Sequence, residues 1–151
     1  MGRIGDTVVS YLQNDNWNFE RINNSENLKC GVKGKNASYR IFFSIKEENN
    51  RLVVYVVSPF NIPEEKRVAA AEFIARANSG MYFGNLELDL DDGEVRYKTS
   101  IDLEGGTLTE KMVENLIYWG YWGMDRYYPG LMALIYGGKS PAEAVKDCDN
   151  V

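Results

Sequence analysis

The sequence predicts an α+β protein, in which an antiparallel sheet is flanked by helices. Two patterns carry this prediction. Strand-like segments follow one another across short polar turns between residues 17 and 57, and such short connections favour antiparallel pairing. Helical apolar spacing precedes and follows them, at residues 6–14, 64–78 and 107–124. A chain of 151 residues can bury one independent core, so residues 1–151 are interpreted as a single domain.

The first half of the chain is predicted to form one helix and four strands. The helix is expected at residues 6–14, where Val8, Tyr11 and Leu12 share one face. Alternating apolar and polar residues predict strands at 17–22, 28–33, 39–45 and 52–57. The last of these, LVVYVV, is apolar on both faces, which is typical of a central strand covered on both sides. Helices or a second subunit could supply that cover.

Capping residues set the helix boundaries expected in the second half. Thr107 and Glu110 form a capping box for a helix that reaches about residue 124. Pro129 is expected to begin a separate helix, because proline is favoured in the first turn. A last short helix is expected at residues 141–146, after a second Ser-Pro start signal.

Residues 84–101 predict a hairpin whose register can be read directly. Asp92-Gly93 is typical of a two-residue type I′ turn, which needs positive φ at both positions. With that turn at the tip, Leu88 lies opposite Tyr97 and Leu86 opposite Thr99. The apolar face is then Leu86, Leu88, Leu90, Val95 and Tyr97. The acidic tip does not fit an EF-hand, because the glycine falls at the fifth position from Asp89 instead of the sixth.

Composition argues against several classes of function. The net charge of −5 argues against a nucleic-acid partner, and the basic residues Lys29, Lys33, Lys35 and Arg40 are interpreted as a solvated sheet face. The chain has no histidine, and its two cysteines lie in no zinc or redox motif, so we expect no metal, cofactor or catalytic residues. No apolar run is long enough to span a membrane, and a cytoplasmic location is expected.

The stretch from residue 118 to residue 128 is the least ordinary part of the chain. It combines Gly120 and Gly123, each of which costs a helix about 1 kcal/mol relative to alanine, with five candidate interaction residues. These candidates are Tyr118, Trp119, Tyr121, Trp122 and Tyr127. Close packing over the two glycines would offset their cost. The aromatic residues then form either a bulky core or a surface for another protein, since Trp and Tyr dominate interface hot spots.

Motifs spread over nearly the whole chain add a family resemblance. They are Tyr11-Leu12 with Trp17-Asn18-Phe19-Glu20, Pro59 with Asn61 and Pro63, Glu72 with Arg76 and Asn78, residues 84–89 with 92–97, Leu108-Thr109, Tyr127-Tyr128-Pro129 and residues 140–144. Their order and spacing resemble the YbjN family of bacterial sensory transduction regulators. One departure is Lys98-Thr99, where the family pattern has an arginine after the tyrosine.

The resemblance implies a fold similar to that of type III secretion chaperones, and a homodimer with a protein partner. It transfers no catalytic residue. The expected function is therefore a non-enzymatic bacterial regulatory or chaperone-like protein-interaction module. The alternative is a small-molecule-sensing domain, with Trp119, Trp122 and Tyr127 lining an apolar pocket.

Overall fold

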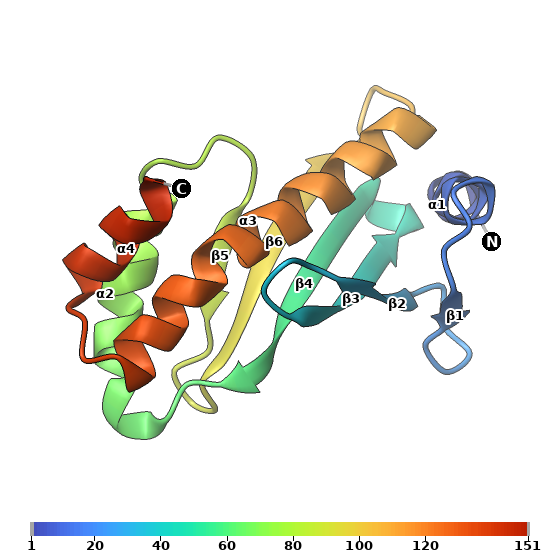
Figure 1. Ribbon diagram of the computed structural model, residues 1–151. Coiled ribbons are helices and arrows are strands. Elements are labelled where there is room, and N and C mark those ends of the chain that lie inside the picture. The colour runs from blue at the N-terminus through green and yellow to red at the C-terminus, as the bar shows by residue number, and fades with distance from the viewer. Residues whose placement is uncertain (1, 151) are drawn as a thin grey trace.

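The computed structural model describes residues 2–150, which form an antiparallel sheet with helices packed over it (Figure 1). The strands lie in the order β1-β2-β3-β4-β6-β5. The helices are α1 (Arg3–Asn14), α2 (Arg67–Asn78), α3 (Glu110–Tyr136) and α4 (Pro141–Asp149). The strands are β1 (Phe19–Arg21), β2 (Leu28–Lys33), β3 (Ser38–Lys46), β4 (Arg51–Asn61), β5 (Asn85–Leu88) and β6 (Glu94–Asp102). The predicted α+β class, with an antiparallel sheet flanked by helices, is confirmed.

Helix α3 crosses the middle of the sheet and packs on β4 and β6, while α2 and α4 lie together beside β5 (Figure 1). The core lies between these helices and the sheet face that carries Phe43, Val54 and Val56, all of which are buried. The predicted strand segments all form strands, although β4 is longer than expected. Two short 3₁₀ turns, Glu47–Asn49 and Glu64–Lys66, connect elements.

The second face of β4 is not covered by a helix in the part of the chain that the structure describes. Of the two covers expected for that face, a helix layer is therefore wrong, and a second subunit stays a prediction. Val53 and Val57 on that face are nevertheless only 8% and 4% exposed. Neighbouring long side chains shield them. Arg96 of β6 lies across the ring of Tyr55, with its guanidinium carbon 4.2 Å from the ring centroid. Arginine stems can cover apolar surface while their charged groups stay in water.

Helix α3 runs unbroken through Pro129, where the sequence predicted a new helix. Proline lacks the N–H that would bond the carbonyl of Asp125, four residues earlier. The side chain of Asn36 supplies a substitute, because its Nδ2 donates to the Asp125 carbonyl oxygen at 2.8 Å. The start of α3 is also corrected. Thr109, and not Thr107, is the N-cap, and its hydroxyl accepts from the Met112 N–H at 3.2 Å.

The β5–β6 hairpin forms where it was predicted, but the predicted register is wrong by two residues. Leu88 pairs with Val95 and Leu86 with Tyr97. Among the described residues near the tip only Gly93 has positive φ, so the turn is not type I′. Instead the loop between β5 and β6 is bonded to the segment that connects β4 to α2, where the N–H of Ile62 donates to the Gly93 carbonyl at 2.7 Å. Because the shift is even, Leu86, Leu88, Val95 and Tyr97 keep their predicted face, while Leu90 is left in the exposed loop.

The first and last helices extend beyond their predicted limits. Helix α1 begins at Arg3, and the Glu47 carboxylate accepts from the N–H of Ile4 at 2.6 Å and from that of Gly5 at 3.1 Å. Helix α4 reaches Asp149, with the predicted Ser140 capping box in place.

Candidate functional site

An aromatic surface lies along α3 and the loop before β5. It consists of Phe83, Tyr118, Trp119, Tyr121 and Trp122, which are joined by ring contacts. The Phe83 and Trp119 centroids are 4.9 Å apart, and Tyr118 stacks on Trp122 at 6.5 Å. Phe83, Tyr118 and Trp122 are 55%, 44% and 37% exposed, which leaves a continuous apolar patch open to solvent.

The two helical glycines explain why these rings point outward. A Cβ atom on Gly120 would lie 2.9 Å from a methyl group of Val56, and one on Gly123 would overlap the ring of Tyr97. The backbone of α3 therefore lies directly on β4 and β6, as the cost of the glycines predicted. No room remains at these two positions for a side chain, and the neighbouring aromatic residues occupy the outer sides of the helix.

Four of the five predicted interaction residues belong to the aromatic surface, and the fifth does not. Tyr127 is only 5% exposed, and its ring packs edge-on against Phe73 at 6.3 Å. Its hydroxyl donates to the Asp149 carboxylate at 2.5 Å. Burial, and then this hydrogen bond, raise the pKa of Tyr127. Tyr127 thus holds α4 against α3 and presents no surface to a partner.

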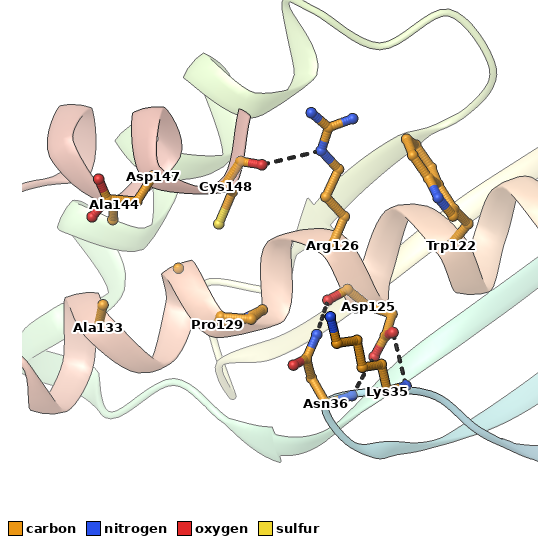
Figure 2. Close-up of a pocket in the computed structure, with 11 residues that line it drawn as sticks. Lys35, Asn36, Trp122, Asp125, Arg126, Pro129, Ala133, Ala144, Asp147 and Cys148 are labelled. Carbon is orange, nitrogen blue, oxygen red and sulfur yellow. Dashed lines mark hydrogen bonds between the residues drawn. The ribbon is translucent and has the colours of Figure 1, made fainter. Parts of the chain in front are cut away.

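A groove of about 590 Å³ lies beside the aromatic surface, between α3, α4 and the turn from β2 to β3 (Figure 2). Trp122 forms one of its walls, and Pro129, Ala133 and Ala144 are among its apolar lining residues. Of the predicted pocket residues Trp119, Trp122 and Tyr127, only Trp122 lines this groove.

Arg126 organises the end of the groove nearest Trp122. Its Nε donates to the Cys148 carbonyl at 3.2 Å and its Nη2 donates to the Asp149 carbonyl at 2.9 Å, so it caps the last turn of α4. The guanidinium also lies 5.1 Å from the Trp122 ring centroid. Burial raises the pKa of the neighbouring Cys148 thiol, which keeps that thiol protonated at neutral pH.

Asp125 anchors the opposite side of the groove and was not singled out by the sequence. Its carboxylate accepts from the N–H groups of Lys35 and Asn36, both at 2.9 Å (Figure 2). It also accepts from the Tyr39 hydroxyl at 2.7 Å. These bonds join α3 to the β2–β3 turn across a large separation in the chain. A single aspartate inside an aromatic helix carries no local signal for such a role.

The polar groups of the site hold backbone segments in place, and its exposed remainder is mainly aromatic. Within residues 2–150 no group of three or more His, Cys, Asp or Glu side chains is arranged to hold a metal ion. None of the helices described is both long and apolar enough to cross a membrane. The cytoplasmic location expected from the sequence stays a prediction.

Comparison with known proteins identifies the protein family of this chain. A family model described as "Putative bacterial sensory transduction regulator" matches residues 5–132, and the chain belongs to this family, YbjN. The crystal structure of "YbjN, a putative transcription regulator from E. coli" superposes with a TM-score of 0.60 at 10% identity, over 89% of each chain. At that identity the likeness shows a shared fold. A search of curated protein sequences found no match.

Proposed function

We propose that this protein is a non-enzymatic regulatory module that acts by binding other polypeptide chains, and that its aromatic surface joins two copies into a homodimer. Membership of a family described as regulators supports the regulatory class. The aromatic surface is the observation that carries the binding role. Large exposed aromatic patches rarely go unused, and Trp and Tyr supply much of the binding energy at protein interfaces.

The local charge at this surface permits a second copy as its occupant, although each chain is acidic as a whole. Each chain carries a net charge of −5, so two copies repel one another unless they meet where few carboxylates are unpaired. The aromatic surface meets that condition. The carboxylates that precede and follow it on α3 are engaged, Glu114 with Lys111 at 2.7 Å and Asp125 with the β2–β3 turn.

Sedimentation velocity and light scattering over the micromolar concentration range test the dimer. We expect the wild-type chain to form a dimer and the double variant Tyr118→Ser/Trp122→Ser to be a monomer. Tyr136→Ser is the matched control, because Tyr136 is 78% exposed at the far end of the same helix and outside the aromatic surface. A wild-type chain that stays monomeric throughout, or a double variant that still dimerises, would refute the proposed dimer.

A second candidate function is the sensing of a small molecule in the groove. Its volume of about 590 Å³ lies within the range of ligand pockets, roughly 300–1,000 Å³, and Trp122 provides a reporter within its wall. In a Trp17→Phe/Trp119→Phe background, a metabolite that enters the groove should shift Trp122 fluorescence and raise the melting temperature. Ala133→Phe, which fills the groove, should abolish both effects. A response that persists in that variant places the ligand elsewhere.

A further inference from the structure

The sheet face that carries no helix is electropositive, in a chain whose net charge is −5. Alternate residues of a strand point to opposite sides of a sheet, so the neighbours of the buried core residues Val54 and Val56 lie on this outer face. On the three central strands β3, β4 and β6, its cations are Arg40, Lys46, Arg51, Arg96 and Lys98, and its carboxylates are Glu94 and Asp102. Glu87 of β5 adds one carboxylate, which Arg96 and Lys98 share at 2.8 and 2.7 Å. The cations still outnumber the carboxylates.

A trough crosses this face where short side chains meet. The register places Ser44, Val53 and Ser100 side by side on β3, β4 and β6. The cross-strand rows on its two sides carry longer side chains, namely Phe42, Tyr55 and Lys98 in one row and Lys46, Arg51 and Asp102 in the other. A hollow of about 570 Å³ lies over this part of the sheet, and Val53, Tyr55, Arg51 and Lys98 are among its lining residues.

The trough has the width of a helix. Its two walls are four residues apart along a strand, as Arg51 and Tyr55 are on β4, which is about 13 Å at about 3.3 Å per residue. An α-helix with its side chains is about 10–12 Å in diameter. A helix bonds its own backbone groups, whereas an extended segment lying on this face would receive no backbone partner from the sheet. The shape therefore favours a helical occupant.

The charges beside the trough favour an acidic occupant. Arg51 lies opposite Asp102 in the register, yet neither Lys46 nor Arg51 has an ion-pair partner among residues 2–150. A second copy meeting this face with its own would bring like charges together, while an acidic partner would find complementary charge.

The aromatic residues of this face are poorly suited to single-stranded nucleic acid. Bases stack on open ring faces, but Arg40 already lies 5.7 Å from the ring centroid of Phe42, and Arg96 lies 4.2 Å from that of Tyr55. The observations thus point to a polypeptide.

We propose that the trough over Ser44, Val53 and Ser100 binds an acidic amphipathic helix of another polypeptide. The apolar stripe of that helix lies on Val53 and Tyr55, and its flanking carboxylates face Arg51 and the other cations of the walls. The aromatic surface lies on the helical side of the sheet, so the proposal does not depend on dimer formation. The rival interpretation is a solvated sheet face whose charges bind nothing.

A labelled helical peptide tests the proposal on the full chain. The probe is blocked and fluorescent, with leucine along one face and glutamate on both flanks, and a second peptide carries lysine in place of glutamate. Ser100→Tyr fills the trough at an exposed strand position, where tyrosine is well tolerated. Arg51→Glu reverses one charge of the wall. Lys146→Glu is its matched control, because Lys146 is also exposed but lies on α4. Thermal unfolding checks that each variant is folded.

We expect the glutamate peptide to bind the wild type and Lys146→Glu within about twofold of each other, and to bind Arg51→Glu at least about fivefold more weakly. Ser100→Tyr should abolish binding. Nuclear Overhauser contacts from the peptide should reach the methyl groups of Val53 on the outer face and not those of Val54 in the core.

Equal binding of the lysine peptide, or equal loss in Arg51→Glu and Lys146→Glu, would overturn the proposal. So would peptide contacts at Tyr118 and Trp122 in place of Val53, because the aromatic surface would then be the binding site. Tighter binding of an oligothymidylate than of the glutamate peptide would assign the face to nucleic acid instead. Self-association of the wild type that Ser100→Tyr abolishes would assign it to a second copy.

Discussion

The side-chain amide of Asn78 makes with Leu86 the two hydrogen bonds that a further strand would make with that residue. Its Oδ1 accepts from the Leu86 N–H at 2.8 Å and its Nδ2 donates to the Leu86 carbonyl at 3.0 Å. Asn78 is the last residue of α2, so one side chain both docks that helix and closes the β5 edge of the sheet. The sequence analysis named Asn78 only as part of a family motif, and this role gives that residue a structural function.

Asn78→Ala should lower the free energy of unfolding by about 1–3 kcal/mol, because it leaves the partly buried Leu86 N–H without a partner. The Leu86 carbonyl then keeps only the bond from Asn85 Nδ2 at 3.2 Å. Asn78→Asp should rescue little, because its carboxylate still accepts from the Leu86 N–H but repels the Leu86 carbonyl oxygen instead of donating to it. Urea denaturation measures both. Glu72→Ala is the control on the same helix, where loss of a half-exposed ion pair should cost about 0–1 kcal/mol. An Asn78→Ala variant as stable as this control would contradict the assigned role.

Gly123→Ala should destabilise the protein although alanine favours helices by about 1 kcal/mol. The added methyl group overlaps the ring of Tyr97, which is buried and held by its hydroxyl bond to the Phe83 carbonyl at 2.7 Å. Overpacking of this kind costs about 1–3 kcal/mol. Thermal and urea unfolding should show the loss.

Asn115→Ala on the exposed side of α3 should instead stabilise slightly, because only helix propensity changes there. Tyr97→Leu should make Gly123→Ala less costly, since the ring that the methyl group meets is gone. Equal costs in both backgrounds would show that the close contact between α3 and β6 is not the cause.

Arg67→Ala should loosen the loop between β5 and β6. The guanidinium donates to the carbonyls of Ile62 at 3.1 Å, Leu90 at 3.3 Å and Asp91 at 3.1 Å, and so ties the loop to the β4–α2 crossing. We expect a loss of about 1–3 kcal/mol and faster amide exchange at Gly93. Arg67→Lys should rescue little, because a single ammonium lacks the planar fork of donors. Lys66→Ala is the control and should leave amide exchange at Gly93 unchanged. If Arg67→Ala also exchanged at Gly93 no faster than the wild type, the hydrogen bonds of Arg67 would not be what holds the loop.

Stability should decline in alkaline solution. Burial raises the pKa of Tyr97 to about 12, and burial with a hydrogen bond to Asp15 raises the pKa of Tyr11 to about 12. An unfolded tyrosine loses its proton near pH 10. The unfolded state therefore binds fewer protons than the folded state above that pH, and the free energy of unfolding falls as pH rises through the folded values.

Urea titrations from about pH 8 to about pH 11 measure this decline. Burial also raises the pKa of the Cys30 thiol to about 12, from an unfolded value of 9.0, so the decline should begin near pH 9. Tyr97→Phe should show a shallower slope than the wild type, because one titrating group is removed. A stability that stays constant up to pH 11 would contradict the burial of these groups.

The hairpin shows how much local pattern can predict. Alternation assigned Leu86, Leu88, Val95 and Tyr97 to one face, and they share it. The pairing itself could not be read locally, because the tip is held by Ile62, Asn61 and Arg67 from the β4–α2 crossing. An even shift preserves every face but changes the residue directly opposite each position. Glu87 therefore lies opposite Arg96 and bonds it, and it also bonds Lys98, its predicted partner.

The candidate site, like the hairpin, could be predicted from the sequence only in part. Four of the five candidate interaction residues, for which a core and a surface were both left open, lie together on a partly exposed surface, and the glycines among them have the close packing expected. Tyr127 could not be distinguished from the others, because its burial depends on Phe73 and Asp149, which are distant in the chain. Asp125 and Arg126 were missed for the same reason, since each acts on backbone groups of another element.

The sequence by itself determined the class of fold, the face of each strand and the family, because alternation, helical spacing and turn residues are properties of neighbouring positions. Tertiary structure alone decided the register of β5 on β6, the continuity of α3 through Pro129 and the closure of the β5 edge by Asn78. Each of these depends on a hydrogen bond whose donor and acceptor belong to different elements, and such pairs form only when the chain has folded.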